Sequence, residues 1–221
     1  MSINGHLREI SPALLQRIQD DPSLTRTIIL GGIQGIPGSV LSHFDGASRE
    51  RDLAAALEHL SPAQQKIAMF AATKIGDFFR KAYSQVGDLS DFEPGSLGEH
   101  LGLGKAWHGL HFLLSGSADP NPTPLGQAVL GGKEIGEDTG YGRPRYLDAA
   151  AVSDIAKALA AVDSSALRRS YDADSMNEAD LYPDDWNEPG TVDWLMQELD
   201  RLREFYGGAA SRGNAALLYH I

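Results

Sequence analysis

The chain has 221 residues, of which 42% are hydrophobic and 22% are charged, a composition typical of a folded globular protein rather than a disordered one. Its 19 Lys and Arg face 30 Asp and Glu, giving a formal net charge of −11 at pH 7. Because nucleic-acid binding requires clustered cations, this balance argues against DNA or RNA as a partner.

No apolar run approaches the roughly 20 residues that a bilayer span requires. The polar first fifteen residues do not resemble a signal peptide, so we expect a cytoplasmic protein without a membrane segment. The chain has no cysteine, which excludes disulfides, thiolate nucleophiles and zinc sites built on cysteine.

The first third of the chain begins with imperfect alternation that predicts a strand over 2–10. Ser11 and Pro12 then form a helix-start signal, and the helix is expected to end near Asp21 and Pro22. Residues 25–46 are rich in glycine, so we predict irregular structure there. Helical spacing of apolar residues predicts helices over 49–60 and from 61 to about 85.

The central segments alternate short elements with loops. A loop at Pro94 and Gly95 leads to an amphipathic segment at 105–114, and a second loop covers 116–124. We predict a strand at 125–130 and a Gly-rich loop at 131–144.

The last third of the chain reads as helices followed by a strand. Asp148 is expected to cap a helix to about 162, a short helix should follow from 163 or 164 to 170, and 191–210 predicts a long amphipathic helix before a strand at 214–220. Together these elements predict an α+β fold: a helix-dominated single domain, 1–221, with a small mixed or antiparallel sheet joining the N- and C-terminal strands.

Nucleotide-binding and nucleophile motifs are missing from the sequence. Gly102 and Gly104 are followed by Trp107 where a dinucleotide fingerprint requires its third glycine, and neither a P-loop nor a Gly-x-Ser-x-Gly elbow occurs. We therefore expect no cofactor.

The first candidate site is the pair His108 and His111, beside Trp107. Their spacing of three places both imidazoles on one side of a helix, where they could bind a metal or a ligand. The sequence indicates no third ligand, so we expect no metal and favour one packed and one solvated histidine.

The second candidate site is the loop over 131–146, which interleaves glycines with carboxylates, phenols and guanidinium groups. Glu137, Asp138, Tyr141, Arg143 and Arg145 are its candidate ligand-binding residues. They would converge on a small polar ligand or support acid/base chemistry; alternatively, the loop is a tight turn whose side chains satisfy the backbone.

A third feature is the acidic stretch from Asp163 to Asp200, which holds eleven acids and two arginines and so carries −9 of the −11. It is either a solvated face or a docking surface for a basic protein. Within it, Tyr182 and Trp186 are either aromatic anchors for a partner or a plug that caps the sheet.

Five ordered blocks resemble the YfbM-like family of bacterial proteins of unknown function: Lys105 to Gly116, Pro124 to Gly131, Glu137 to Gly142, Leu167 to Pro183 and Arg212 to Leu217. The first dozen residues are also similar, whereas 31–93 is not covered and would be a variable helical insertion. The resemblance implies a compact α+β domain and brings no established activity, cofactor or catalytic residue.

Two hypotheses of function follow. We favour a non-enzymatic binding or interaction protein that presents an acidic face or a polar pocket to a basic protein or a small polar ligand. The alternative is a hydrolase or transferase that uses His108 or His111 with Glu137 or Asp138.

Overall fold

A computed structural model of the chain describes residues 2–32 and 92–221. Residues 1–26 and 92–221 form one compact unit, and 27–91 form a second that lies almost entirely outside the described ranges. The helices predicted at 49–60 and 61–85 also lie outside them, as does nearly all of the insertion expected at 31–93. No helix within the described ranges is both long and apolar enough to cross a membrane.

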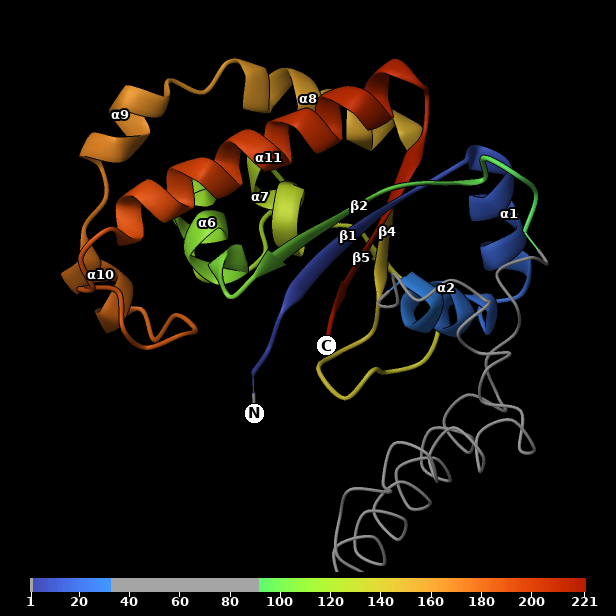
Figure 1. Ribbon diagram of the computed structural model, residues 1–221, viewed down its shortest axis with the longest axis horizontal. Coiled ribbons are helices and arrows are strands. Elements are labelled where there is room, and N and C mark those ends of the chain that lie inside the picture. The colour runs from blue at the N-terminus through green and yellow to red at the C-terminus, as the bar shows by residue number, and fades with distance from the viewer. Residues whose placement is uncertain (1, 33–91) are drawn as a thin grey trace, which may run out of the picture. The chain divides into compact units, whose positions relative to one another are not determined.

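The described elements follow one another in chain order as in Figure 1. They are β1 (Gly5–Ile10), α1 (Pro12–Asp20), α2 (Leu24–Gly32), β2 (Leu97–Gly104), α6 (Ala106–Ser115), α7 (Pro124–Leu130), β3 (Lys133–Glu134), β4 (Arg145–Leu147), α8 (Ala149–Ala160), α9 (Ser164–Arg169), α10 (Ala173–Glu178), α11 (Thr191–Ser211) and β5 (Ala215–His220).

The strands form a five-stranded sheet in the order β2-β1-β5-β4-β3, and every neighbouring pair is antiparallel. The two terminal strands, β1 and β5, therefore pair near the middle of the sheet, with His6 opposite Tyr219 and Leu7 opposite Leu218. This arrangement confirms the predicted α+β class and the predicted joining of the N- and C-terminal strands.

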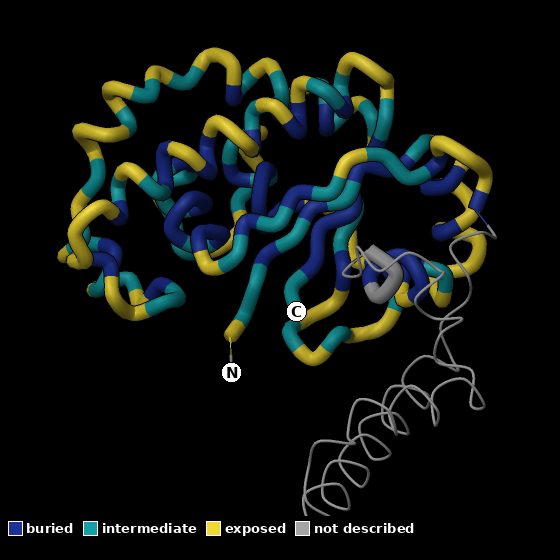
Figure 2. The backbone as a smooth tube through the Cα atoms, in the orientation of Figure 1, coloured by how far each residue is buried: buried dark blue, intermediate teal, exposed yellow. Residues whose placement is uncertain are grey.

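Side-chain alternation gives the sheet two different faces. On one face, Leu7 lies between its cross-strand partners Leu101 and Leu218, and all three belong to the main hydrophobic core. Helices α6, α7, α8 and α11 contribute to the same core, and Figure 2 shows buried stretches along them. The other face carries His6 and Arg8.

The predicted helix starts are confirmed by their hydrogen bonds. The Ser11 hydroxyl accepts from the amide of Leu14 with Pro12 in the first turn, and the Asp148 carboxylate accepts from the amide of Ala151. Asp163 caps α9 in the same way. Each side chain satisfies a backbone donor that the helix itself leaves unpaired.

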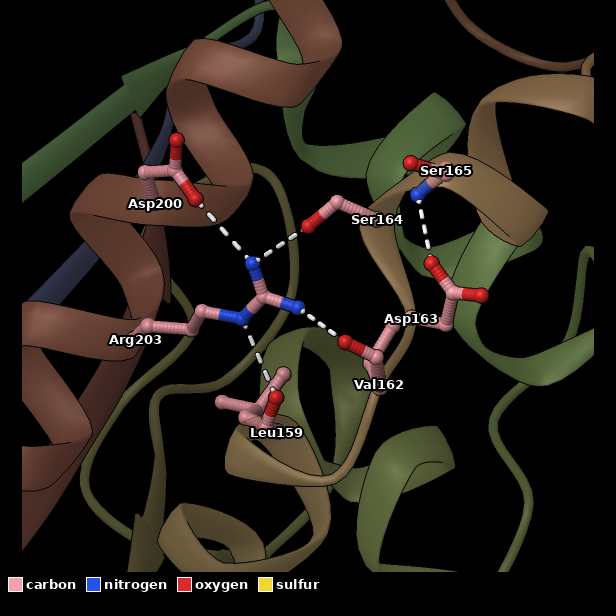
Figure 3. A network of polar contacts seen from close by, with 7 residues as sticks. All are labelled: Leu159, Val162, Asp163, Ser164, Ser165, Asp200 and Arg203. Atoms are coloured by element: carbon pink, nitrogen blue, oxygen red, sulfur yellow. Dashed lines mark hydrogen bonds and ion pairs between the residues drawn. The ribbon is translucent and has the colours of Figure 1, made fainter.

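Arg203 on α11 ties that helix to the connection between α8 and α9 (Figure 3). Its Nε donates to the carbonyl of Leu159 at 3.0 Å, and its Nη2 donates to the carbonyl of Val162 at 2.6 Å. Its Nη1 donates to Ser164 Oγ and to Asp200 Oδ1. The guanidinium thus caps the carbonyl end of α8, where positive charge is favourable.

The strand predicted at 125–130 is wrong, because this segment is the helix α7. Thr123 Oγ1 accepts from the amide of Gly126, and Pro124 occupies the first turn. The Thr-Pro pair is the same kind of start signal as Ser11-Pro12, and it outweighs the short apolar run that suggested a strand.

Other elements also depart from the sequence prediction, among them the short strands β3 and β4 and the helix α10, none of which was predicted. Residues 24–32 are helical rather than irregular, although β-branched residues and glycine weaken helix propensity there. Strand β2 was not predicted, because its three glycines disfavour a strand. One of them is needed for packing: a Cβ on Gly98 would lie 2.5 Å from the carboxylate of Glu9.

Glu9 is a fully buried carboxylate with four donors. Arg212 donates to both of its oxygens at 2.7 Å, Asn214 Nδ2 donates at 2.7 Å, and the amide of Glu99 donates at 3.0 Å. Burial raises the pKa of Glu9, but these hydrogen bonds and the charge of Arg212 outweigh it and lower the pKa to about 2. The carboxylate thereby joins β1 to β2 and to the turn between α11 and β5.

Replacing Glu9 by glutamine should lower the free energy of unfolding at pH 7 by about 2 to 3 kcal/mol, because charge-assisted hydrogen bonds are lost. A carboxylate whose pKa is lower in the folded than in the unfolded state stabilises the fold at pH values above its unfolded pKa. The difference in unfolding free energy between the parent and Glu9→Gln should therefore shrink as pH falls from about 4.5 toward 2. Urea denaturation of both proteins across this range measures it. The exposed Glu134→Gln control should stay within about 0.5 kcal/mol of the parent, and a deficit independent of pH would contradict the assignment.

Candidate functional site

Trp107 lies in the first turn of α6 and packs over the start of β1. Its indole Nε1 donates to the carbonyl of Ile3 at 3.4 Å, and its ring meets His220 edge-on with centroids 4.5 Å apart. This close approach requires Gly5, since a Cβ there would lie 2.5 Å from the Cβ of Trp107. The missing side chain of Gly5 in β1 therefore makes room for Trp107.

His108 stacks on Trp107, with ring centroids 4.5 Å apart. Its Nδ1 accepts from the amide of Tyr182 at 3.0 Å, so its Nε2 carries the proton and donates to the carbonyl of Ala118 at 3.1 Å. Burial lowers the pKa of His108 and outweighs the favourable carbonyl of Ala118. Both ring nitrogens are thus engaged within the fold, and neither offers a lone pair to a metal.

His111 lies one turn further along α6 and is fully buried. Its Nε2 contacts the carbonyl of Asp119 at 3.1 Å and the hydroxyl of Ser115 at 3.3 Å, while its Nδ1 has no partner among the described residues. His108 and His111 bind different carbonyls rather than a common ligand. Within 2–32 and 92–221, no group of three or more His, Cys, Asp or Glu side chains is placed to hold a metal ion.

Tyr182 joins this aromatic group from the segment after α10. Its hydroxyl accepts from the amide of Ile3 at 3.1 Å, and its ring lies 6.2 Å from that of Trp107. Hydrogen bonds from Ser2 and Ile3 lower the pKa of its phenol. The structure therefore brings together Trp107, His108 and Tyr182, which the sequence had placed in separate candidate sites.

The two candidate acids of the Gly-rich loop, Glu137 and Asp138, contact other groups of the protein. Asp138 Oδ1 accepts from the amides of Gly140 at 2.7 Å and Gly142 at 3.1 Å, in a turn where both glycines have positive φ. Glu137 lies 3.7 Å from Arg26 in an exposed ion pair. These contacts match the tight-turn alternative of the sequence analysis.

His220 on β5 contacts both the Gly-rich loop and α6. The sequence analysis did not single it out. Thr139 Oγ1 donates to the carbonyl of His220 at 2.8 Å, while Trp107 packs on its ring. Burial lowers the pKa of His220 to about 4, assisted by the charge of Arg145 and by His6 and His108. Its position opposite Gly5, in the register of the two terminal strands, was the only signal available.

We refer to Trp107, His108, Arg145, Tyr182 and His220 as the His220 cluster. Arg145 is fixed in it by donation from Nη1 to the carbonyl of Leu130 at 2.9 Å. The half-buried Tyr141 and the exposed Arg143 make no hydrogen bond or ion pair with another described residue. In the described part of the chain, likewise, no hydrogen bond or ion pair joins His108 or His111 to Glu137 or Asp138.

The imidazole of His220 should titrate with a midpoint near pH 4 instead of 6.5, which a histidine NMR titration measures. Because the unfolded chain takes up the proton more readily, the free energy of unfolding should fall as pH drops from 6.5 to 4. His220→Asn should remove the resonance and reduce this loss of stability. A midpoint close to 6.5 would show that the ring is not desolvated against Trp107.

Comparison with known proteins agrees with this fold. A family model described as a domain of unknown function, DUF1877, matches residues 1–219. The solved structure of YfbM from Escherichia coli, a protein of unknown function, superposes with a TM-score of 0.56 at 17% identity, over 99% of each chain. A search of curated proteins returned no match. The family match confirms the YfbM-like resemblance: the chain belongs to the DUF1877 family of domains of unknown function.

Proposed function

We propose that this protein is a non-enzymatic binding protein that docks a basic protein partner on an acidic surface. That surface consists of exposed carboxylates on α10 and in the segment 179–190 that follows it. Its members are Asp174, Glu178, Asp180, Asp184, Asp185 and Glu188.

The observation that carries the proposal is that the eleven acids from Asp163 to Asp200 differ in their contacts. Two cap helices, Asp163 on α9 and Asp172 on α10. Three pair with arginines on or near α11: Asp193 with Arg168, Glu198 with Arg201 and Asp200 with Arg203. The six of the acidic surface make no side-chain hydrogen bond or ion pair with another described residue, so their charge is available to a partner.

Tyr182 gives this surface an aromatic centre. It is partly exposed between Asp180 and Asp184 in the chain, and Asp184 lies close enough to influence its phenol. Partly exposed tyrosines are frequent anchors in protein interfaces. Trp186 does not share that role, because it is 1% exposed and its Nε1 donates to the carbonyl of Leu181.

An acidic surface of this kind favours a partner with exposed Lys and Arg. Complementary charge raises the association rate and discriminates against acidic proteins, and its effect weakens with salt. The net charge of −11 acts in the same direction over longer distances.

The hydrolase or transferase alternative receives no support from the contacts of its residues. A general base needs a lone pair within reach of substrate. Both nitrogens of His108 are already bonded within the fold, and His111 is fully buried. Among the described residues, neither histidine contacts Glu137 or Asp138 through a hydrogen bond or ion pair. We therefore base the proposal on binding.

The test begins with affinity capture at low salt from the source cells, followed by calorimetry with the purified partner. Asp184→Asn combined with Asp185→Asn should weaken binding by about tenfold, mainly through slower association, since exposed charge pairs contribute up to about 1 kcal/mol each. Raising the salt concentration should narrow the difference between parent and variant.

The matched control combines Asp20→Asn with Asp154→Asn, two exposed acids on α1 and α8. It changes the net charge by the same amount, so it should bind like the parent if location matters. Recovery of no partner at low salt, or equal weakening by both double variants, would overturn the proposal.

A further inference from the structure

The face of the sheet opposite the helical core carries the cationic side chain of Arg8, on β1. Its cross-strand partners are His100 on β2 and Leu217 on β5, and these three strands are consecutive in the sheet (Figure 1). His6 lies two residues earlier on β1, on the same face, and is directly opposite Tyr219. The guanidinium group is therefore flanked by two imidazoles and a phenol from three adjacent strands.

Arg8 has no anionic partner in the part of the chain that the structure describes. Its Nε is buried and lacks a hydrogen-bond partner, and no carboxylate of 2–32 or 92–221 forms an ion pair with it. The carboxylate of Glu9, the next residue along β1, lies on the other face of the sheet and is bonded to Arg212 and Asn214. The charge of Arg8 is therefore not neutralised by direct contact.

The surroundings of Arg8 leave its charge poorly solvated. On the same face, Ile10 and Leu217 are 0% exposed and Tyr219 is 2% exposed. Arg8 itself stays partly exposed, so a small solute can approach it. Burial is the largest influence on the pKa of Arg8 and lowers it, yet an arginine remains charged. A charge in such surroundings lowers stability unless an ion of opposite sign accompanies it.

The rings beside Arg8 supply a further hydrogen-bond donor. His6 Nδ1 lies 3.2 Å from His100 Nε2, and Tyr219 Oη lies 3.3 Å from the same nitrogen. When His100 Nε2 carries a proton, it donates to both of these atoms, and the hydroxyl proton of Tyr219 is then free to donate elsewhere. Burial raises the pKa of Tyr219 to about 12, so the phenol keeps that proton at neutral pH.

We propose that Arg8 and Tyr219 bind the carboxylate group of a small organic acid on this face of the sheet. A guanidinium group presents its Nε–H and one Nη–H in parallel, which matches the two oxygens of a carboxylate. The hydroxyl of Tyr219 adds a third donor. The site is separate from the His220 cluster and does not depend on the acidic surface.

The charge of the site favours a carboxylate over a phosphate. Burial lowers the pKa of His6 to about 4, and burial together with the charge of Arg8 also lowers the pKa of His100. Both imidazoles are therefore neutral at pH 7, and Arg8 supplies a single positive charge. A carboxylate neutralises that charge, whereas a phosphate dianion brings a second negative charge into a partly buried site.

The test titrates the full chain with sodium acetate at pH 8, where inorganic phosphate is mainly a dianion, and sodium chloride holds the ionic strength constant. The ring resonances of His6 and His100 should shift saturably, and those of His220 on the other face should not. Because acetate is so small, its dissociation constant should be about millimolar. At about ten times that concentration, Tm should rise by roughly 3 to 6 °C relative to chloride alone. Phosphate should bind more weakly than acetate.

Variants separate this site from general attraction of anions. Arg8→Met should abolish saturable acetate binding, and in chloride its Tm should equal or exceed that of the parent, because an unpaired and partly buried charge is removed. Tyr219→Phe should weaken acetate binding about tenfold through loss of one hydrogen bond, and it tests the site independently if Arg8→Met does not fold. The matched control Arg169→Met removes the same charge from an exposed position on α9 and should bind acetate like the parent.

The proposal fails if acetate in excess produces no saturable shift of the His6 and His100 resonances. Equal affinity of the parent and Arg8→Met also contradicts it, because the anion would then bind elsewhere on the chain. Tighter binding of phosphate than of acetate would contradict the carboxylate assignment, and a lower Tm of Arg8→Met in chloride would show that the charge of Arg8 is already compensated within the fold.

Discussion

The carboxylate of Glu9 is charged and fully buried, and a buried charge is tolerated only where donors surround it. Its donors come from the amide of Glu99 on β2 and from Arg212 and Asn214 between α11 and β5. These contacts tie β1 to both of its neighbours in the sheet. They also require Gly98, because any side chain there would occupy the space of the carboxylate.

The same sheet separates two groups of aromatic and imidazole side chains. The His220 cluster lies on the face that α6 covers, where Gly5 admits Trp107, and Tyr182 connects it to the acidic surface. His6, His100 and Tyr219 lie on the opposite face. Alternation along β1 and β5 is enough to separate them, since neighbouring residues such as Tyr219 and His220 point in opposite directions.

Local signals predicted much of this fold. Caps at Ser11, Asp148 and Asp163, together with apolar periodicity, located most of the helices of 2–32 and 92–221, but not α2, α7 or α10. Strand β2 was not predicted, because its glycines are explained only by Glu9 and His6 across the strand pair. Of the His220 cluster, Trp107, His108, Arg145 and Tyr182 were singled out from the sequence, but their meeting with His220 was not predicted. That meeting depends on the pairing of the first strand with the last, which no local pattern encodes.

The place of β5 in the sheet has a consequence for how the sheet is assembled. β5 lies between β1 and β4, so it joins two strand pairs that no other strand connects, β1 with β2 and β3 with β4. Arg212 and Asn214 immediately precede β5, so the segment that joins the two pairs also brings the side-chain donors of Glu9. Closure of the sheet and neutralisation of its buried charge therefore depend on the same few residues, 212–220.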